Sequence, residues 1–246
     1  MTDDIHKRMK AGFDLLRKAG ISVMNDVFYQ GGPGAEQLSG VKGAKGYVSY
    51  SAGHLWPYKL ICALLQKAVD AGVNLQTHTP VTGVSGAPDA EGYYALTTKE
   101  RGTVKAKRII YATNGYTSSI LPEFENKIIP VKGLCSHIVP KKPAPLLPNS
   151  YMIRWSPTEY EYLIPRLDGS IIVGGARSKF YSDLSSWYNT VEDDKLITAG
   201  NAHHHFDGYM QKNFKGWEDS GAYTEKIWTG GESPVPLHWY STRSLT

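Results

Sequence analysis

The pattern of apolar and polar positions predicts two amphipathic helices in the first third of the chain. The apolar positions of the first helix recur every three or four residues: Ile5, Met9, Phe13 and Leu16. This spacing marks one helix face over residues 3–19, and acidic residues before it and basic residues after it are typical of helix ends. The second helix is predicted to begin at Pro57 and to end at Gly72, again with one apolar face.

Strand patterns follow the second helix. Residues 73–77 are predicted to be a strand, and the order helix, glycine, strand is typical of a crossover in a parallel sheet. Residues 108–112 are a β-branched apolar run that predicts a buried strand, and residues 113–115 suit a tight turn after it. Ligands of open α/β sheets lie beyond the carboxyl ends of strands, so this turn is a candidate cofactor edge. Any parallel strand that ends in a turn has the same pattern.

Hairpin signals recur in the rest of the chain. Two hairpins are predicted, residues 92–98 with 103–106 and residues 160–165 with 170–174. The second is centred on Asp168 and Gly169, a strong turn signal. A helical pattern covers residues 193–214, a last strand covers 223–229, and residues 231–246 have no periodicity, which predicts an irregular tail.

The composition is that of a folded globular protein. Of the 246 residues, 41% are hydrophobic and 20% are charged. The net charge of +4 is small and its lysines and arginines are scattered, which argues against a nucleic-acid or membrane partner and suits an anionic small molecule. No signal-like apolar segment opens the chain and no run of about 18 apolar residues occurs in it. We therefore expect a cytoplasmic protein.

Candidate metal and redox residues are few. Cys62 and Cys135 lie in apolar settings without a CxxC partner, which predicts buried thiols. His203, His204 and His205 are consecutive within a helical pattern, so they point in different directions and cannot share one metal ion as histidines four residues apart do. We expect solvated histidines here and no metal site.

Five segments occur in an order and spacing that resemble one protein family. They are GHLWPYKL at 53–60, THTPV at 77–81, RIIYATNGY at 108–116, YLIPR at 162–166 and GGAR at 174–177. The chain resembles FAD-dependent oxidoreductases of the D-amino-acid oxidase and sarcosine oxidase (DAO) type, above all the fungal members. The resemblance implies the fold class α/β plus α+β, with an incomplete Rossmann-like FAD-binding domain interleaved with an antiparallel-sheet substrate domain. Residues 49–131 would belong to the former, and residues 1–48 and 132–230 to the latter.

The resemblance also implies which residues contact FAD. They are Gly53, His54, Leu55, Trp56, Val81, Ala112, Thr113, Asn114 and Gly115. The first four are similar to the segment that approaches the isoalloxazine ring, although His54 stands where a small residue is expected. Val81 corresponds to a strand end at the adenine side, and the last four correspond to a turn over the dinucleotide.

Two residues are similar to those that face the flavin from strands in relatives. Arg177 is expected to pair bidentately with a substrate carboxylate, and Tyr162 to donate a hydrogen bond; a surface arginine and a core tyrosine are the alternatives. The implied reaction is oxidation of a C–N bond in an amine or amino acid. The neutral amine transfers hydride equivalents to the flavin, water hydrolyses the resulting imine, and dioxygen reoxidises the flavin to give hydrogen peroxide.

Two parts of the family's pattern are missing from this sequence. No Gly-x-Gly-x-x-Gly segment is present to hold a pyrophosphate, and the residues after Gly230 depart from the family. The resemblance therefore implies a chain truncated at both ends, with a missing N-terminal Rossmann segment as a partner. A cofactor-free small-molecule-binding module or pseudoenzyme is the alternative function, and a fragment that needs a separate partner chain is a third.

Overall fold

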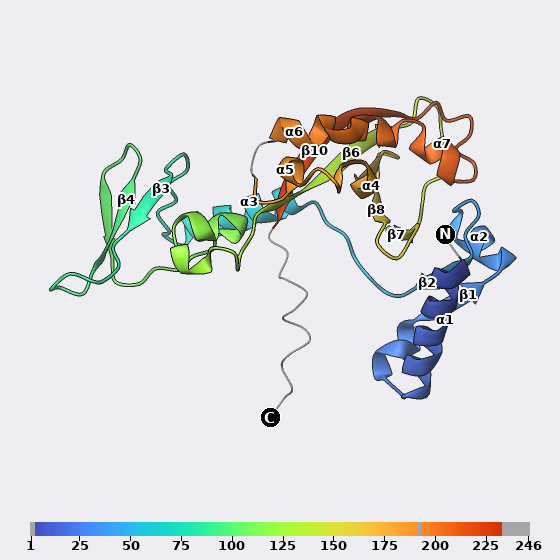
Figure 1. Ribbon diagram of the computed structural model, residues 1–246, viewed down its shortest axis with the longest axis horizontal. Coiled ribbons are helices and arrows are strands. Elements are labelled where there is room, and N and C mark those ends of the chain that lie inside the picture. Colours follow the sequence, from blue (N-terminus) through green and yellow to red (C-terminus); the bar gives the residue numbers. More distant parts are fainter. Residues whose placement is uncertain (1–2, 191–192, 233–246) are drawn as a thin grey trace. The chain divides into compact units, whose positions relative to one another are not determined.

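A computed structural model of the chain describes residues 3–190 and 193–232, which divide into two compact units. Unit 1 joins Met1–His54 with Lys132–Gly230, and unit 2 consists mainly of Leu55–Val131 (Figure 1). Unit 2 is thus inserted into the sequence of unit 1. The protein is a mixed α/β fold with antiparallel sheets.

The N-terminal part of unit 1 is a helix followed by a small hairpin. Its elements are α1 (Asp3–Lys18), η1 (Ser22–Asp26), β1 (Phe28–Gly31), α2 (Pro33–Ser39) and β2 (Gly46–Ser49). The predicted helix over residues 3–19 is confirmed, with acidic residues in its first turn and basic residues in its last turn. Strands β1 and β2 pair antiparallel. Val41 forms a bridge to Phe214, which attaches this part to the C-terminal half of unit 1.

The rest of unit 1 is built on a five-stranded sheet of order β10-β6-β9-β8-β7. The strands are β6 (Val131–Val139), β7 (Tyr151–Arg154), β8 (Tyr160–Pro165), β9 (Ile171–Gly175) and β10 (Tyr223–Glu232). The predicted β8–β9 hairpin is confirmed. At its turn Gly169 has a φ of 82°, and the Asp168 carboxylate accepts a hydrogen bond from the Ser170 amide at 2.9 Å.

One face of this sheet is covered by short helices. They are α4 (Arg177–Phe180), α5 (Leu184–Trp187), α6 (Asp193–Thr198), η4 (Ala199–Phe206) and α7 (Tyr209–Asn213). Leu134 and Leu163 from the sheet and Phe206 and Met210 from the helices belong to one buried cluster, which is the core. The single helix predicted over residues 193–214 is wrong, because Gly200 and Asn201 adopt left-handed backbone angles and break it.

Unit 2 contains one long helix and a three-stranded antiparallel meander. Its elements are α3 (Pro57–Asp70), β3 (Val81–Val84), β4 (Tyr94–Thr98), β5 (Thr103–Ala106), η2 (Asn114–Ser119) and η3 (Pro122–Phe124). The helix predicted from Pro57 and the hairpin predicted around Gly102 are both confirmed. In the described part of the chain, no helix is both long and apolar enough to cross a membrane.

Two predicted strands of unit 2 are wrong. Residues 73–77 and 108–112 have no strand structure, and Ile110 is 91% exposed. A strand is defined by backbone hydrogen bonds to a neighbour, and neither segment belongs to any sheet among the described residues. The predicted parallel crossover is therefore absent from this part of the chain. The apolar face of α3 is likewise exposed, and Leu64 on it is 52% exposed. Cys62 is also exposed, so the prediction of a buried thiol there is wrong.

Candidate functional site

The face of the five-stranded sheet opposite the helices carries a row of polar side chains. Along β6 the residues alternate between buried and half-buried. Alternation along a strand sends successive side chains to opposite faces, so Cys135 and His137 lie on the face opposite the buried Leu134 and Ser136. We call this half-exposed side the open face of the sheet.

Tyr162 lies across the open face. Strand register places Tyr162 beside Gly174 and Gly174 beside Cys135, so the three residues form one line across β8, β9 and β6. The Tyr162 hydroxyl is 2.8 Å from the Cys135 sulfur. A side chain at Gly174 would place its Cβ 2.0 Å from Cζ of the Tyr162 ring. The missing side chain of Gly174 is therefore what allows the tyrosine to reach across β9.

A second polar group on this face surrounds His137. Its Nδ1 is 2.9 Å from a carboxylate oxygen of Glu225, and its Nε2 is 3.2 Å from a guanidinium nitrogen of Arg166. A guanidinium can only donate, so Nε2 accepts and the proton of a neutral ring lies on Nδ1, facing Glu225. Arg166 also pairs with Asp168 at 3.4 Å. Hydrogen bonds from the hydroxyl and the amide of Ser170, together with this arginine, hold the pKa of Asp168 below its ordinary value.

Arg177 lies at the end of β9, close in sequence to Gly174. The prediction that it occupies a strand position is wrong, because it is the first residue of α4 and follows Ala176, whose φ is 61°. Its guanidinium carbon lies 4.3 Å from the ring centroid of Tyr181 and 5.9 Å from that of Trp187. Among the described residues no carboxylate forms an ion pair with it. The rings fix the guanidinium and leave its N–H groups available to a ligand.

The residues predicted to bind FAD are divided between the two units. Gly53 and His54 end the first segment of unit 1, and the remaining seven belong to unit 2. Leu55 and Trp56 are 59% and 51% exposed. Residues 112–115 come together where the chain enters the short helix η2, and the φ of Asn114 is 46°. The predicted tight turn is therefore a left-handed residue followed by 3₁₀ structure.

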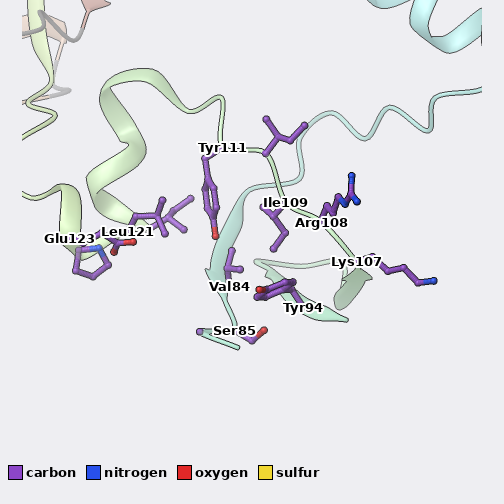
Figure 2. A pocket seen from close by; sticks show the side chains of 13 residues that line it. Val84, Ser85, Tyr94, Lys107, Arg108, Ile109, Tyr111, Leu121 and Glu123 are labelled. Carbon is purple, nitrogen blue, oxygen red and sulfur yellow. The ribbon is translucent and has the colours of Figure 1, made fainter. Parts of the chain in front are cut away.

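Unit 2 contains a hollow of about 770 Å³. Figure 2 shows Ile109 and Tyr111 on the side of the β3–β4 hairpin, where Val84 and Tyr94 complete the wall. Ile110, between them in sequence, is almost fully exposed. None of the residues predicted to bind FAD lines this hollow. Within residues 108–112, the side chains of Ile109 and Tyr111 thus lie toward the β3–β4 hairpin, and the side chain of Ile110 is left exposed.

A buried carboxylate on the helix-covered side of the sheet was not predicted. Glu161 is 1% exposed and accepts hydrogen bonds from Trp155 Nε1 at 2.6 Å, from the Tyr209 hydroxyl at 2.7 Å and from His205 Nε2. Burial acts to raise the pKa of Glu161, but these hydrogen bonds outweigh it and the pKa lies below its ordinary value. Burial, followed by the charge of Glu161, raises the pKa of Tyr209 far above its ordinary value.

This cluster corrects one expectation and identifies the signal that was overlooked. His205 is not a solvated histidine, because its side chain is only 19% exposed and pairs with Glu161. Within residues 3–190 and 193–232 no group of three or more His, Cys, Asp or Glu side chains is arranged to hold a metal ion. The overlooked signal was a charged residue at position 161, an inward-facing position in the alternation of β8.

The chain is similar to known proteins over most of its length. A family model described as FAD dependent oxidoreductase (DAO) matches residues 8–230. The probable oxidoreductase OrdL of Rhizobium meliloti (strain 1021) is 26% identical over 124 residues, which are 50% of this chain and 28% of OrdL.

Solved structures share the fold at low sequence identity. L-proline dehydrogenase from P. horikoshii has a TM-score of 0.66 at 17% identity, over 96% of this chain and 59% of that chain. Glycine oxidase from Bacillus cereus ATCC 14579 has a TM-score of 0.62 at 15% identity, over 90% of this chain and 57% of that chain. The chain spans less than two thirds of the length of each of these relatives.

Proposed function

The chain belongs to the DAO family of FAD-dependent oxidoreductases, and from this premise we propose that it oxidises a C–N bond of an amine or amino acid, passing reducing equivalents to flavin and then to dioxygen. FAD is the family's cofactor. The observation that carries the proposal is Tyr162 laid across Gly174 on the open face, with Arg177 just beyond the end of the same strand. L-proline dehydrogenase and glycine oxidase, which share the fold, are named for amino acids and support this substrate class.

In this proposal unit 1 is the substrate domain and unit 2 is part of the FAD-binding domain. Unit 1 supports this because its antiparallel sheet is covered by helices on one face and keeps polar side chains on the other. Unit 2 supports it because residues 112–115 form a turn at the end of an extended apolar segment.

The residues present fit a flat aromatic ring and part of a dinucleotide. Nothing lies within 4 Å of the Cβ that a side chain would add at Gly53, so a ring has room to approach the backbone there. Leu55 and Trp56 offer exposed apolar surface beside it in sequence. His54 stands where a small residue is expected, and its Nδ1 lies 3.0 Å from the Ser150 hydroxyl, which holds the imidazole to unit 1. Bound FAD supplies the electron acceptor for the reaction.

The roles of the protein residues follow from their contacts. Arg177 lies against two aromatic rings and has no carboxylate partner within the described part of the chain. It binds the carboxylate of an amino-acid substrate through its fork of N–H donors. Tyr162 donates a hydrogen bond from its hydroxyl to the bound substrate in place of its contact with Cys135. Together they orient the carbon that carries the amine, and the sheet behind them excludes water from one side.

We further propose that FAD binding needs an additional Rossmann-type segment, supplied N-terminally or by a partner chain. The sequence contains no Gly-x-Gly-x-x-Gly phosphate-binding motif. In unit 2 the apolar face of α3 and the side chain of Ile110 are exposed. No strand in the described part of the chain pairs with the backbone of residues 108–112. A strand that paired with residues 108–112 and a layer that covered α3 would satisfy both.

The proposal is tested by adding FAD to the purified chain, alone and together with a Gly-x-Gly-x-x-Gly segment produced separately. We expect FAD to remain bound to the protein in the combined sample, where its visible absorbance detects it. Hydrogen peroxide should then form when amino acids are added. Arg177→Ala should raise KM for amino acids but not for amines without a carboxylate, while Lys142→Ala, an exposed charge on a loop, should change neither. A sample that takes up no flavin and forms no peroxide in either preparation would refute the proposal.

The alternative function is a cofactor-free binding module, which Arg177 also supports, because its guanidinium forms no ion pair with any carboxylate among residues 3–190 and 193–232. In that case carboxylate ligands would raise the melting temperature of the flavin-free protein, and Arg177→Ala would abolish the increase. Peroxide would not form with any substrate.

A further inference from the structure

A pair of aromatic rings lies beside Arg177 at the end of β9. The rings are Tyr181, which follows α4, and Trp187, the last residue of α5. Their centroids are 5.4 Å apart and their planes differ by 22°, so the rings are stacked. We call Tyr181 and Trp187 the ring pair. Tyr188 extends it, with its ring centroid 5.8 Å from that of Trp187.

The ring pair is held in place by the protein itself. The Trp187 ring packs on Phe180, a core residue that is 4% exposed, with a centroid separation of 6.4 Å. Trp187 Nε1 also donates a hydrogen bond to the backbone oxygen of Tyr181 at 3.3 Å, which ties α5 to the end of α4. Since these contacts need no ligand, the rings are already ordered when one arrives, and less entropy is lost on binding.

The ring pair covers only one side of the Arg177 guanidinium. The guanidinium carbon is 4.3 Å from the Tyr181 centroid and 5.9 Å from the Trp187 centroid. A cation between two rings would hold their centroids almost twice as far apart as they are, so Arg177 lies beside the pair and not within it. The rings fix the position of the charge, and the side of the guanidinium that faces away from them is not covered by either ring.

Much of the aromatic surface beside this charge is exposed. Tyr181 is 51% exposed and Tyr188 is 41% exposed. A guanidinium binds a carboxylate through its N–H edge, and the centroid of the Tyr181 ring is only 4.3 Å from the guanidinium carbon. The atoms that a ligand carries next to its carboxylate therefore come within reach of the Tyr181 ring. An apolar group at that place would cover aromatic surface that is otherwise in water.

We propose that the ring pair selects the side chain of the substrate, and that the preferred substrate is an amino acid with an aromatic or similarly large apolar side chain. Its carboxylate pairs with Arg177 while its side chain covers the ring of Tyr181. The proposal rests on the proposed function through the carboxylate-binding role of Arg177, and it narrows the substrate class of that site. Tyr181 is thus a specificity-determining residue, because a small amino acid leaves its ring in water.

The test is an NMR titration of the full-length, flavin-free chain with propanoate and with 3-phenylpropanoate, two carboxylates of equal charge that differ by one ring. The Nε–H signal of Arg177 reports binding of the carboxylate, and the indole N–H signal of Trp187 reports the ring pair. We expect 3-phenylpropanoate to bind about tenfold more tightly than propanoate, since it adds an aromatic contact. The neutral 3-phenylpropanamide should bind more weakly than 3-phenylpropanoate, because it cannot form the ion pair.

The ratio of the two carboxylate affinities separates a contact with the ligand from a merely structural role of Tyr181. If the ring only held the guanidinium, Tyr181→Ala would weaken both ligands equally and leave the ratio unchanged. We expect Tyr181→Ala to remove the preference for 3-phenylpropanoate and Tyr181→Phe, which keeps the ring, to retain it. The matched control is Tyr223→Ala on β10, where a ring 41% exposed lies 5.2 Å from the Lys141 ammonium, and it should leave the ratio unchanged.

The outcomes distinguish this inference from the function on which it rests. Equal affinities of the wild type for both carboxylates, or a preference that persists in Tyr181→Ala, would overturn the inference and leave the carboxylate-binding role of Arg177 in place. Failure of both carboxylates to bind would overturn that role together with the inference. Tyr181 is exposed, so its variants retain the fold and the comparison remains valid.

Discussion

Gly174→Ala tests the contact on which the proposed substrate site depends. The added Cβ would lie 2.0, 2.2 and 2.5 Å from Cζ, Oη and Cε2 of Tyr162, whereas ordinary van der Waals contact begins at 3.4 Å. The ring would therefore have to move by about 1.4 Å, the difference between 2.0 and 3.4 Å. Overpacking of this kind typically costs about 1–3 kcal/mol of unfolding free energy. Tyr162 is only half-buried, so we expect a value within that range and not above it.

A double-mutant cycle isolates the clash. In a Tyr162→Ala background the ring is gone, and Gly174→Ala should then cost less than about 0.5 kcal/mol, since alanine is no worse than glycine in a strand. The coupling between the two positions should accordingly be about 1–3 kcal/mol. The matched control is Gly133→Ala in β6 of the same sheet, where nothing lies within 4 Å of the added Cβ and little change is expected.

The measurement is the urea dependence of unfolding for the wild type, the variants and the double variant. An equal loss of stability from Gly174→Ala in both backgrounds would show that Tyr162 does not lie over Gly174. A large loss from Gly133→Ala would show that alanine is disfavoured throughout the sheet for a reason unrelated to the ring. Either result would remove the geometric basis for assigning Tyr162 to the substrate site.

Three further predictions concern the buried cluster and the exposed helix. The pKa of Glu161 is lower in the folded protein than its ordinary value of 4.5. The ionised carboxylate therefore stabilises the fold above pH 4.5, and this stabilisation is lost as the pH falls through the folded pKa. The free energy of unfolding should accordingly decline less with acid in Glu161→Gln than in the wild type. Burial and the charge of Glu161 raise the pKa of Tyr209, and burial also raises the pKa of Tyr151. An ultraviolet titration should therefore show fewer tyrosines ionising at ordinary alkaline pH in the folded state than in the unfolded state, and Tyr209→Phe should reduce that difference by one tyrosine. Leu163→Ala, at a site with 0% exposure, should lower the free energy of unfolding by about 2–5 kcal/mol. Leu64→Ala on the exposed face of α3 should lower it by less than about 1 kcal/mol in the chain alone. A large loss of stability at Leu64 would show that the α3 face is covered.

Much of unit 1 could be predicted from local pattern. The turn at Asp168 and Gly169 specified the β8–β9 hairpin, and the helical spacing of apolar residues specified α1. Tyr162 was correctly placed on a strand, but Arg177 was not, because the left-handed Ala176 ends the strand before it. Such a backbone angle at alanine is imposed by the surrounding fold, and alanine carries no local signal for it.

The segment at residues 108–112 shows where local pattern fails. Its β-branched residues predicted a buried strand, yet Ile110 is almost fully exposed and no strand among the described residues pairs with this backbone. A β-branched run records a preference for extended, half-buried backbone, whereas a strand also requires a second strand beside it. The same holds for the apolar face of α3, which formed as a helix but is not covered.

By itself the sequence determined the helices α1 and α3 and the hairpins β4–β5 and β8–β9, because capping, turn and periodicity signals act over a few residues. It also contains the ordered segments that resemble the DAO family, and the DAO family model matches residues 8–230. Only the tertiary structure decided that Glu161 is saturated by His205, Tyr209 and Trp155, that Tyr162 reaches across Gly174, and that α3 remains exposed. Burial and hydrogen bonding depend on residues that are distant in sequence, so no local pattern contains them.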